Sequence, residues 1–311
     1  LFTAYSDTKI TLFLNYAVLP GIGDGAFYIP AVAIAQRWFN KRRDFVVGII
    51  TAGVPISGLI INPLSAYILE TSSLESTLMV LALITFTLSF SAFLMKENPE
   101  QLGLQPYGGP FLNDKDPSLT EWTTSEAIRT DAFPILYILM FFGMLAFLMV
   151  VTLQFDYAIN NNLDLLSSSI APASIAAGSF LGRLVTGYLA DFVDRNKILF
   201  SVFLGQSLSI LIILNANTIY DYAMFGILFG FCYGGWIPIF PSLLKDFYGK
   251  TNAGQIFGVF GTGFSLSALI GPPLAGYLVD QFNTYQYGFY ISITVCLIGA
   301  FMALTIKKPS K

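Results

Sequence analysis

Long runs of apolar residues separated by short polar segments dominate the pattern of this chain. Several runs reach the roughly 20 residues that an α-helix needs to cross the hydrocarbon core of a bilayer. The runs are continuously apolar and do not alternate from one residue to the next, so they predict a helical bundle and not a membrane barrel. We expect nine membrane-spanning helices, at residues 11–36, 45–69, 77–95, 134–155, 163–190, 197–214, 222–244, 254–279 and 286–306.

The composition agrees with a polytopic, all-α membrane protein. Of the 311 residues, 55% are hydrophobic and 11% are charged, whereas a soluble domain carries about a quarter charged residues. The absence of His removes imidazole acid–base chemistry and the commonest metal ligand. Both Cys lie in apolar runs, which suggests no disulfide or metal cluster. The net charge of −3, with scattered basic residues, argues against nucleic-acid binding. We therefore expect no enzyme, no cofactor and no metal.

The basic residues indicate the orientation in the membrane, because short basic loops stay in the cytoplasm. Fourteen of the sixteen Lys and Arg residues fall in one set of alternate loops and in the C-terminal tail. Lys9 falls in the other set, and Arg183 lies inside a span. This pattern predicts a multi-pass protein of the cell membrane with a cytoplasmic C-terminus.

The longest connection between spans, residues 96–132, is rich in Pro, Gly and acidic residues. Such a composition is typical of a solvated linker. It divides the chain into residues 1–95, the C-terminal half of an N-terminal helix bundle with three spans, and residues 133–311, a C-terminal six-helix bundle. The linker itself is expected in the cytoplasm.

The beginning and the end of the chain resemble each other. Offsets of 208 and 210 residues align Pro30, Phe39, Gly48, Gly53, Ser57, Pro63 and Tyr67 with Pro238, Phe247, Gly258, Gly263, Ser267, Pro273 and Tyr277. A parallel repeat is typical of a transporter built from two similar halves. If the repeat is whole, three further helices precede Leu1. The alternative is that apolar helices rich in Gly and Pro simply look alike.

Residues 38–53, WFNKRRDFVVGIITAG, resemble the aromatic-Phe-x-Lys-Arg-Arg-x-Leu-Ala-x-Gly-x-Ala-x-Ala-Gly signature of the monocarboxylate transporters, in the major facilitator superfamily. Residues 187–191, GYLAD, followed by Arg195, look like the cytoplasmic-loop motif of the superfamily. Residues 98–104, NPEQLGL, look like the oxalate/formate-antiporter-like branch. The resemblance implies the major facilitator fold, with the nine visible transmembrane helices corresponding to family helices 4 to 12 of an N-terminally truncated chain.

Arg183 is the first candidate for substrate binding. A cation inside a span costs roughly 2.5–3.5 kcal/mol unless it faces a partner or a watery cavity. Its planar, permanently charged fork suits a carboxylate, and the resemblance puts it in the place of the family's substrate Arg. Ser179 stands where the family carries an Asp four residues earlier. The alternative is a structural Arg that snorkels towards the cytoplasm or pairs with Asp191.

Further candidates for the central cavity lie on two other spans. Asp24 sits midway along the first span and is a candidate for proton coupling, since burial raises a carboxyl pKa and an approaching Arg lowers it. The alternative is that its neighbouring glycines let a packed helix accept its hydrogen bond. Tyr28, Tyr233 and Trp236 are assigned to substrate binding, with plain packing as the alternative.

The remaining charged motifs are candidates for gating. Lys41, Arg42 and Arg43, together with Asp191 and Arg195, can form ion pairs that stabilise one state of a rocking transporter. Topology determination by positive charge explains any basic loop equally well. Small-residue spacings predict close helix packing at Gly178/Gly182, Gly226/Gly230/Gly234 and Gly254/Gly258.

These observations together predict a secondary active transporter of a small organic anion, a monocarboxylate or a dicarboxylate. We expect it to work by alternating access in the lipid bilayer and to be coupled to protons. The alternatives are a major facilitator porter for a drug, sugar or amino acid, with Arg183 purely structural, and a non-transporting membrane fragment.

Overall fold

The computed structural model describes residues 3, 6, 8–109, 121–249 and 252–310, without the side chains of residues 16, 17, 24–29, 62, 63, 66, 165 and 166. Within these ranges the chain is almost entirely helical, and its extended pairing is an isolated bridge between Phe39 and Tyr107. The chain forms two units, here called unit 1 (Leu1–Asn40 with Ser57–Phe111) and unit 2 (Lys41–Ile56 with Leu112–Lys311).

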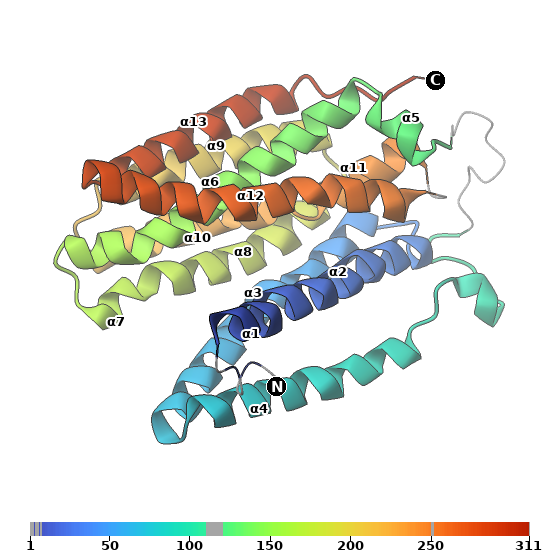
Figure 1. Cartoon of the computed structure of the whole chain (residues 1–311). Coiled ribbons are helices and arrows are strands. Elements are labelled where there is room, and N and C mark those ends of the chain that lie inside the picture. The colour runs from blue at the N-terminus through green and yellow to red at the C-terminus, as the bar shows by residue number, and fades with distance from the viewer. Residues whose placement is uncertain (1–2, 4–5, 7, 110–120, 250–251, 311) are drawn as a thin grey trace. The chain divides into compact units, whose positions relative to one another are not determined.

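Unit 1 holds the early helices and unit 2 the later ones (Figure 1). Unit 1 contains α1 (Lys9–Phe13), the π-helix Leu14–Val18, α2 (Leu19–Trp38), α4 (Leu74–Ser89) and the 3₁₀-helices Phe90–Leu94 and Pro99–Leu102. Unit 2 contains α5 (Thr124–Ile128), α6 (Ala132–Asn160), α7 (Leu165–Ser168), α8 (Ile170–Leu189), α9 (Arg195–Leu214), α10 (Ile219–Trp236), α11 (Ile239–Tyr248), α12 (Ala253–Phe282) and α13 (Gln286–Ala303). Helix α3 (Arg43–Thr71) contributes its first half to unit 2 and its second half to unit 1.

Seven helices of the described chain are long and apolar enough to cross a membrane. They are Arg43–Ile61, Leu74–Leu94, Ala132–Asn160, Arg195–Leu214, Ile219–Tyr248, Ala253–Phe282 and Gln286–Ala303. Each coincides with one of the nine predicted spans, and Ile219–Tyr248 joins α10 and α11 into the span predicted at 222–244. The other two predicted spans coincide with α2 and α8, which are helical but do not belong to the seven, so the count of nine stays a prediction.

Local sequence explains where the helices of unit 2 begin. The Thr218 side chain accepts a hydrogen bond from the Asp221 main-chain N–H, and the Asp221 carboxylate accepts one from the Thr218 N–H at 2.8 Å. This reciprocal capping satisfies donors that the first turn of a helix leaves free. Asp194 caps α9 in a similar way, accepting from the Asn196 N–H at 2.9 Å. Both caps stand between two apolar runs and separate one helix from the next.

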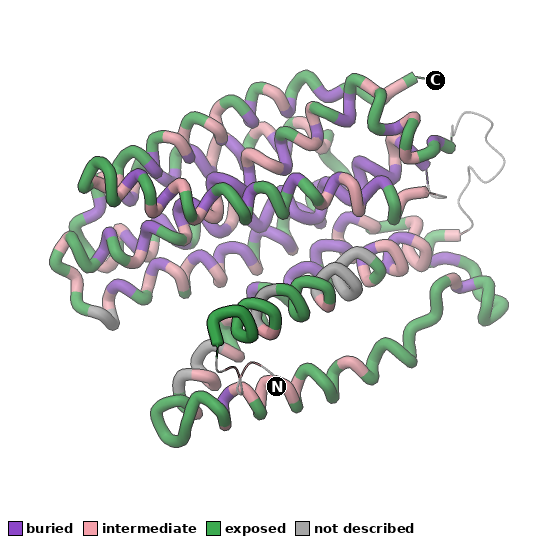
Figure 2. Tube along the Cα trace, viewed as in Figure 1, coloured by how far each residue is buried: buried purple, intermediate pink, exposed green. Residues whose placement is uncertain are grey.

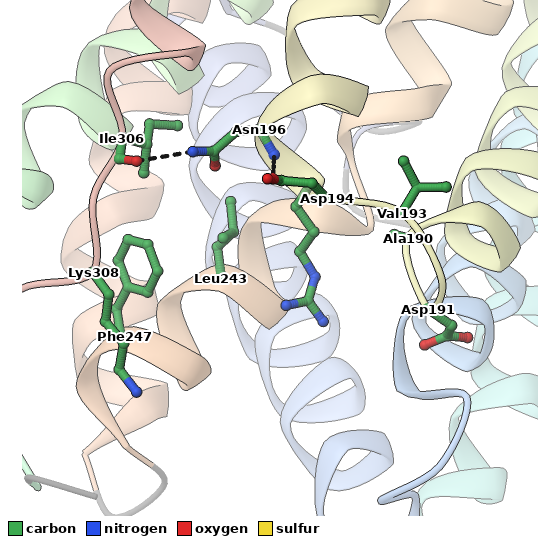
Figure 3. Close-up of a pocket in the computed structure, with 10 residues that line it drawn as sticks. Ala190, Asp191, Val193, Asp194, Asn196, Leu243, Phe247, Ile306 and Lys308 are labelled. Carbon is green, nitrogen blue, oxygen red and sulfur yellow. Dashed lines mark hydrogen bonds between the residues drawn. The ribbon is translucent and has the colours of Figure 1, made fainter. Parts of the chain in front are cut away.

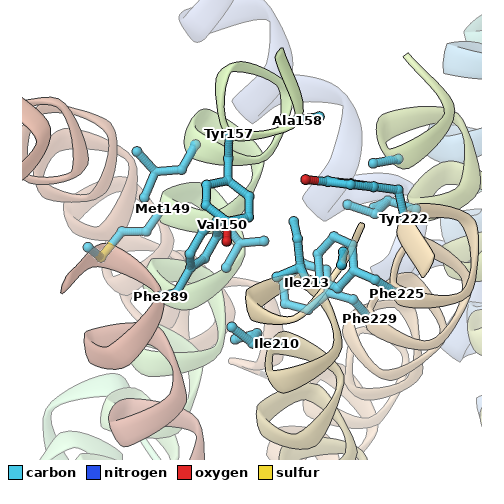
Figure 4. Packing of buried hydrophobic residues seen from close by; sticks show 14 of the residues in the cluster. Met149, Val150, Tyr157, Ala158, Ile210, Ile213, Tyr222, Phe225, Phe229 and Phe289 are labelled. Carbon is cyan, nitrogen blue, oxygen red and sulfur yellow. The ribbon is translucent and has the colours of Figure 1, made fainter. Parts of the chain in front are cut away.

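The core of unit 2 is formed by helices that pack in the order α8, α10, α9, α13, α6 and α12. Its centre is aromatic and aliphatic, with Tyr222, Phe225 and Phe229 of α10 close to Met149 of α6 and Phe289 of α13 (Figure 4). Buried positions recur along each of these helices in Figure 2, whereas α4 of unit 1 is mostly exposed. Exposed apolar faces of this kind are those expected to contact lipid.

Glycines bring α8 and α10 into backbone contact. A Cβ would lie 2.1–2.3 Å from a carbonyl oxygen of the facing helix at four glycines, Gly178, Gly182, Gly230 and Gly234. Real Cβ atoms are essentially never closer than 3.0 Å to another heavy atom. The predicted close packing at the first two small-residue spacings is therefore confirmed. At Gly254 and Gly258, a Cβ would meet no described atom within 4 Å.

Candidate functional site

The first half of α3 and the second half of α8 meet at two glycines of unit 2. A Cβ on Gly48 of α3 would lie 2.4 Å from the main-chain oxygen of Arg183. A Cβ on Gly187 of α8 would lie 2.7 Å from the main-chain oxygen of Asp44. Because both contacts are made with backbone atoms, the two helices have no room for larger residues here. This α3–α8 contact carries a buried cation in its middle and a charged cluster at its end.

Arg183 is the buried cation, on α8 and only 3% exposed. Its guanidinium Nη1 donates a hydrogen bond to the main-chain oxygen of Thr51 on α3. Its Cζ lies 5.9 Å from the centre of the Tyr233 ring on α10, within the range of a cation–π interaction. Arg183 therefore lies between α3 and α10, beside the buried Ser179 one turn earlier on its own helix.

The structure brings Tyr233 to Arg183 and places Trp236 behind it. The Tyr233 ring stacks on Phe147 of α6, with ring centres 3.6 Å apart, and meets the Trp236 ring edge-on at 5.4 Å. Trp236 is fully buried, and its Nε1 donates to the Gln206 side-chain oxygen at 3.3 Å. The polar edge of Trp236 is thus held by α9, and its ring supports Tyr233.

A cluster of charged side chains lies where α3 and α9 begin. Arg195 donates from Nε (3.2 Å) and Nη2 (2.6 Å) to Oδ2 of Asp44, and from Nη1 to Oδ2 of Asp246 on α11 at 2.5 Å. Arg43 donates to Oδ1 of the same Asp246 at 2.8 Å. The Asp44 side chain is fully buried, while those of Arg195 and Asp246 are 23% and 36% exposed. We call these residues, together with Asp191, the charged cluster.

Asp191 joins this cluster from the α8–α9 loop. Its Oδ1 accepts a hydrogen bond from the main-chain N–H of Asp44 at 3.4 Å, in the first turn of α3. A carboxylate at a helix N-terminus is favoured by the helix dipole. Burial, and next the negative charge of Asp44, nevertheless raise the pKa of Asp191 above its usual value. Asp191 is consequently easier to protonate than an exposed Asp.

A cavity of about 460 Å³ borders the charged cluster. Residues of the α8–α9 loop, of α11 and of the C-terminal segment line it. Figure 3 shows Phe247 and Lys308 on one side, opposite the loop that carries Val193 and Asp191. The Asn196 side chain donates to the Ile306 carbonyl at 2.8 Å and fastens the C-terminal segment beside it.

The predicted site residues are only partly brought together. Arg43, Asp191 and Arg195 lie in one cluster, whereas Lys41 and Arg42 are exposed beside it, and Arg42 has a left-handed backbone with φ of 58°. The side chains of Asp24 and Tyr28, both on α2, lie outside the described part of the structure. Their roles stay predictions.

Sequence reasoning missed the acidic members of the charged cluster, Asp44 and Asp246. Each stands directly after a basic residue in a predicted basic loop, as Arg43-Asp44 and Lys245-Asp246. The topology prediction used only the positive charges of the loops and therefore did not consider these acidic residues. Acidic residues inside otherwise basic loops are the signal that would have indicated ion pairing.

Comparisons with known proteins indicate the family of the chain. The family model described as Major Facilitator Superfamily matches residues 1–219 and 164–311. The chain is 28% identical over 274 residues to the uncharacterized MFS-type transporter YhjX of Escherichia coli, covering 86% of this chain and 65% of that protein. It is 26% identical over 318 residues to human monocarboxylate transporter 11, covering 99% of this chain and 66% of that protein. Human monocarboxylate transporter 10 is 24% identical over 299 residues, covering 93% of this chain and 57% of that protein. The chain therefore spans less than two thirds of the length of these relatives.

Proposed function

Because the chain belongs to the Major Facilitator Superfamily, we propose that the protein is a secondary active transporter of a small organic anion, a monocarboxylate or a dicarboxylate. The observation that carries this proposal is Arg183, a guanidinium buried on a helix of a membrane protein. A buried cation is energetically costly in a bilayer unless it binds an anion or faces a polar cavity. Two relatives are named monocarboxylate transporters, which supports a carboxylate as the ligand.

In this proposal Arg183 holds the substrate carboxylate with two parallel N–H groups. Tyr233 covers the guanidinium, and Trp236 keeps the Tyr233 ring in place through their edge-on contact. Tyr28 completes the binding residues, and Asp24 carries the coupling proton. Alternating access then moves the bound anion between the two sides of the membrane.

The helices take the family's order and orientation in this proposal. The nine predicted spans are family helices 4 to 12, and the C-terminus lies in the cytoplasm of a cell-membrane protein. The concentration of Lys and Arg in one set of loops supports this orientation. The charged cluster then lies at the cytoplasmic ends of α3, α8, α9 and α11, where Arg43, Asp191 and Arg195 stabilise one state of the transporter. Exposed Lys41 and Arg42 add positive charge at its edge.

A second candidate function is a porter for a neutral solute. The contact that favours it is the hydrogen bond from Arg183 to the Thr51 carbonyl, because that bond gives the guanidinium a structural role between α3 and α8. In that case the charge of Arg183 would not be needed for the substrate.

Uptake into proteoliposomes containing the complete protein separates these candidates. We expect Arg183→Gln to lower uptake of the preferred carboxylate about 30-fold or more, since losing one partner of a buried charge pair costs at least about 2 kcal/mol. Arg183→Lys keeps the positive charge but loses the planar pair of N–H donors, so its uptake should lie between those of the unaltered protein and Arg183→Gln. Arg129→Gln, at an exposed Arg of the linker, is the matched control. Unchanged carboxylate uptake by a folded Arg183→Gln protein would contradict the proposal, and uptake of a neutral solute alone would favour the second candidate.

A further inference from the structure

Asp44 is the most deeply buried carboxylate of the charged cluster, and only half of it is satisfied. Its Oδ2 accepts both hydrogen bonds from Arg195. Its Oδ1 is buried and has no hydrogen-bond partner among the described residues. A buried carboxylate oxygen without a donor is unfavourable, because it has lost its water and gained nothing in exchange.

Asp191 likewise has one carboxylate oxygen without a hydrogen-bond donor. Its Oδ1 accepts from the Asp44 main-chain N–H, while its Oδ2 is buried and also lacks a partner in the described structure. Two adjacent carboxylates thus meet at the first turn of α3, each with one buried oxygen that needs a donor. Their mutual repulsion adds to the cost of keeping both ionised.

The surrounding cations do not remove this defect. Arg195 divides its guanidinium between Asp44 and Asp246, and acts on Asp191 only through space. Arg43 donates to Asp246. Other charged groups of the packed elements include Lys245 on α11, Lys197 on α9, Asp194 and Lys308 around the cavity, and Lys41 and Arg42 before α3. No hydrogen bond that the structure describes runs from any of these cations to Asp191.

We propose that Asp191 and Asp44 together bind one proton, placed on Oδ2 of Asp191, and that this proton holds the α8–α9 loop against the start of α3. Protonation turns Asp191 Oδ2 from an acceptor into a donor, so that it can serve the Asp44 carboxylate, whose Oδ1 lacks a donor. It also removes one negative charge next to Asp44. Asp191 Oδ1 continues to accept the hydrogen bond from the Asp44 N–H. Asp191 lines the adjoining cavity, which gives the proton a short route to and from water.

We call this protonated contact between Asp191 and Asp44 the proton latch. The raised pKa of Asp191 determines the direction in which the latch depends on pH. The folded protein binds the proton more tightly than the unfolded chain, whose Asp titrates near 3.8. The contribution to stability is therefore complete below that value and is lost as the pH rises through the raised pKa of the folded state. The latch is tighter in acid and looser near neutrality.

The test uses the complete protein in nanodiscs and does not depend on the transported solute. We expect its infrared spectrum to contain a protonated-carboxyl band that titrates above the ordinary Asp range and disappears in Asp191→Asn. In Asp44→Asn, the midpoint of this band should shift towards the ordinary value, because the neighbouring charge is gone. Asp194→Asn is the control, since it lies in the same loop, lines the same cavity, and Asn caps a helix as well as Asp does.

Thermal melting provides a second readout. As the pH rises from about 3.8 to neutrality, we expect the melting temperature of the unaltered protein and of Asp194→Asn to fall by the same amount, and that of Asp191→Asn to fall less. A carboxyl band that persists in Asp191→Asn would overturn the inference, as would equal pH slopes in all three proteins. A melting temperature that responds to sodium concentration at fixed pH would show a metal cation in place of the proton and would overturn it as well.

Discussion

Replacing Gly182 by Ala tests whether the contact between α8 and α10 is as tight as the structure shows. The added Cβ would lie 2.1 Å from the main-chain oxygen of Phe231 and 2.9 Å from its main-chain carbon. Ordinary contact begins at 3.4 Å, so relief requires a displacement of the difference between 3.4 Å and 2.1 Å, about 1.3 Å. Both neighbours are backbone atoms, and no side chain can turn away to make room.

The expected cost follows from two opposing terms. Overpacking a close contact costs about 1–3 kcal/mol, and rigid backbone neighbours put Gly182→Ala at the upper end. Replacing Gly by Ala inside a helix returns about 1 kcal/mol. The net loss is therefore about 2 kcal/mol, which lowers the melting temperature of a unit of this size by about 4–8 °C. In the proposed function, carboxylate uptake should fall too, because Arg183 is the next residue on α8.

The melting temperature is measured from tryptophan fluorescence in detergent micelles, since the fully buried Trp236 reports on unit 2. Gly276→Ala is the matched control, because a Cβ at Gly276, inside α12, meets no described atom within 4 Å. It should melt at the same temperature as the unaltered protein or slightly above. If Gly182→Ala and Gly276→Ala had the same melting temperature, the backbone contact between α8 and α10 would not exist as described.

Two further predictions concern buried polar contacts. Trp236→Phe removes the indole donor from Gln206, and we expect a loss of about 1–3 kcal/mol, seen as a lower melting temperature; adding Gln206→Leu should recover part of it. Arg195→Gln leaves the fully buried Asp44 without its cation and should cost about 3 kcal/mol or more. Asp246→Asn acts on partly exposed ion pairs, with Arg43 and with Arg195, and should cost about 1 kcal/mol or less. Equal melting temperatures for these last two variants would contradict the difference in burial.

The spans were predictable because a membrane helix needs little more than length and apolarity. The run predicted at 197–214 is helix α9, Arg195–Leu214, and the run predicted at 45–69 lies within α3, Arg43–Thr71. In each case the helix begins two residues before the predicted start, at a basic residue of the loop. Hydropathy places the boundary among the charged residues that flank a run, whereas a helix continues through charged residues that good caps and ion pairs support.

The contacts between helices were less predictable, because they depend on which faces meet. The spacing of small residues is alike at Gly178/Gly182 and Gly254/Gly258, yet only the first pair faces another described helix closely. Small residues permit contact but do not choose a partner. The same holds for Arg43 and Asp246, which are 203 residues apart and pair only after folding. One acceptor of Arg183 is the main-chain oxygen of Thr51, and no side-chain pattern could have indicated it.

The α3–α8 contact joins the candidate binding residue to the charged cluster. Gly48 packs on the Arg183 backbone and Gly187 packs on the Asp44 backbone, so the two sites lie along the same α3–α8 contact within unit 2. Helix α3 carries both the Asp44 that binds Arg195 and the Thr51 that binds Arg183, so a displacement of the whole helix would affect both contacts. Coupling between two sites is reciprocal. In the proposed function, an anion that drew the Arg183 guanidinium away from α3 would loosen the α3–α8 contact, and the proposed proton on Asp191 would oppose that release.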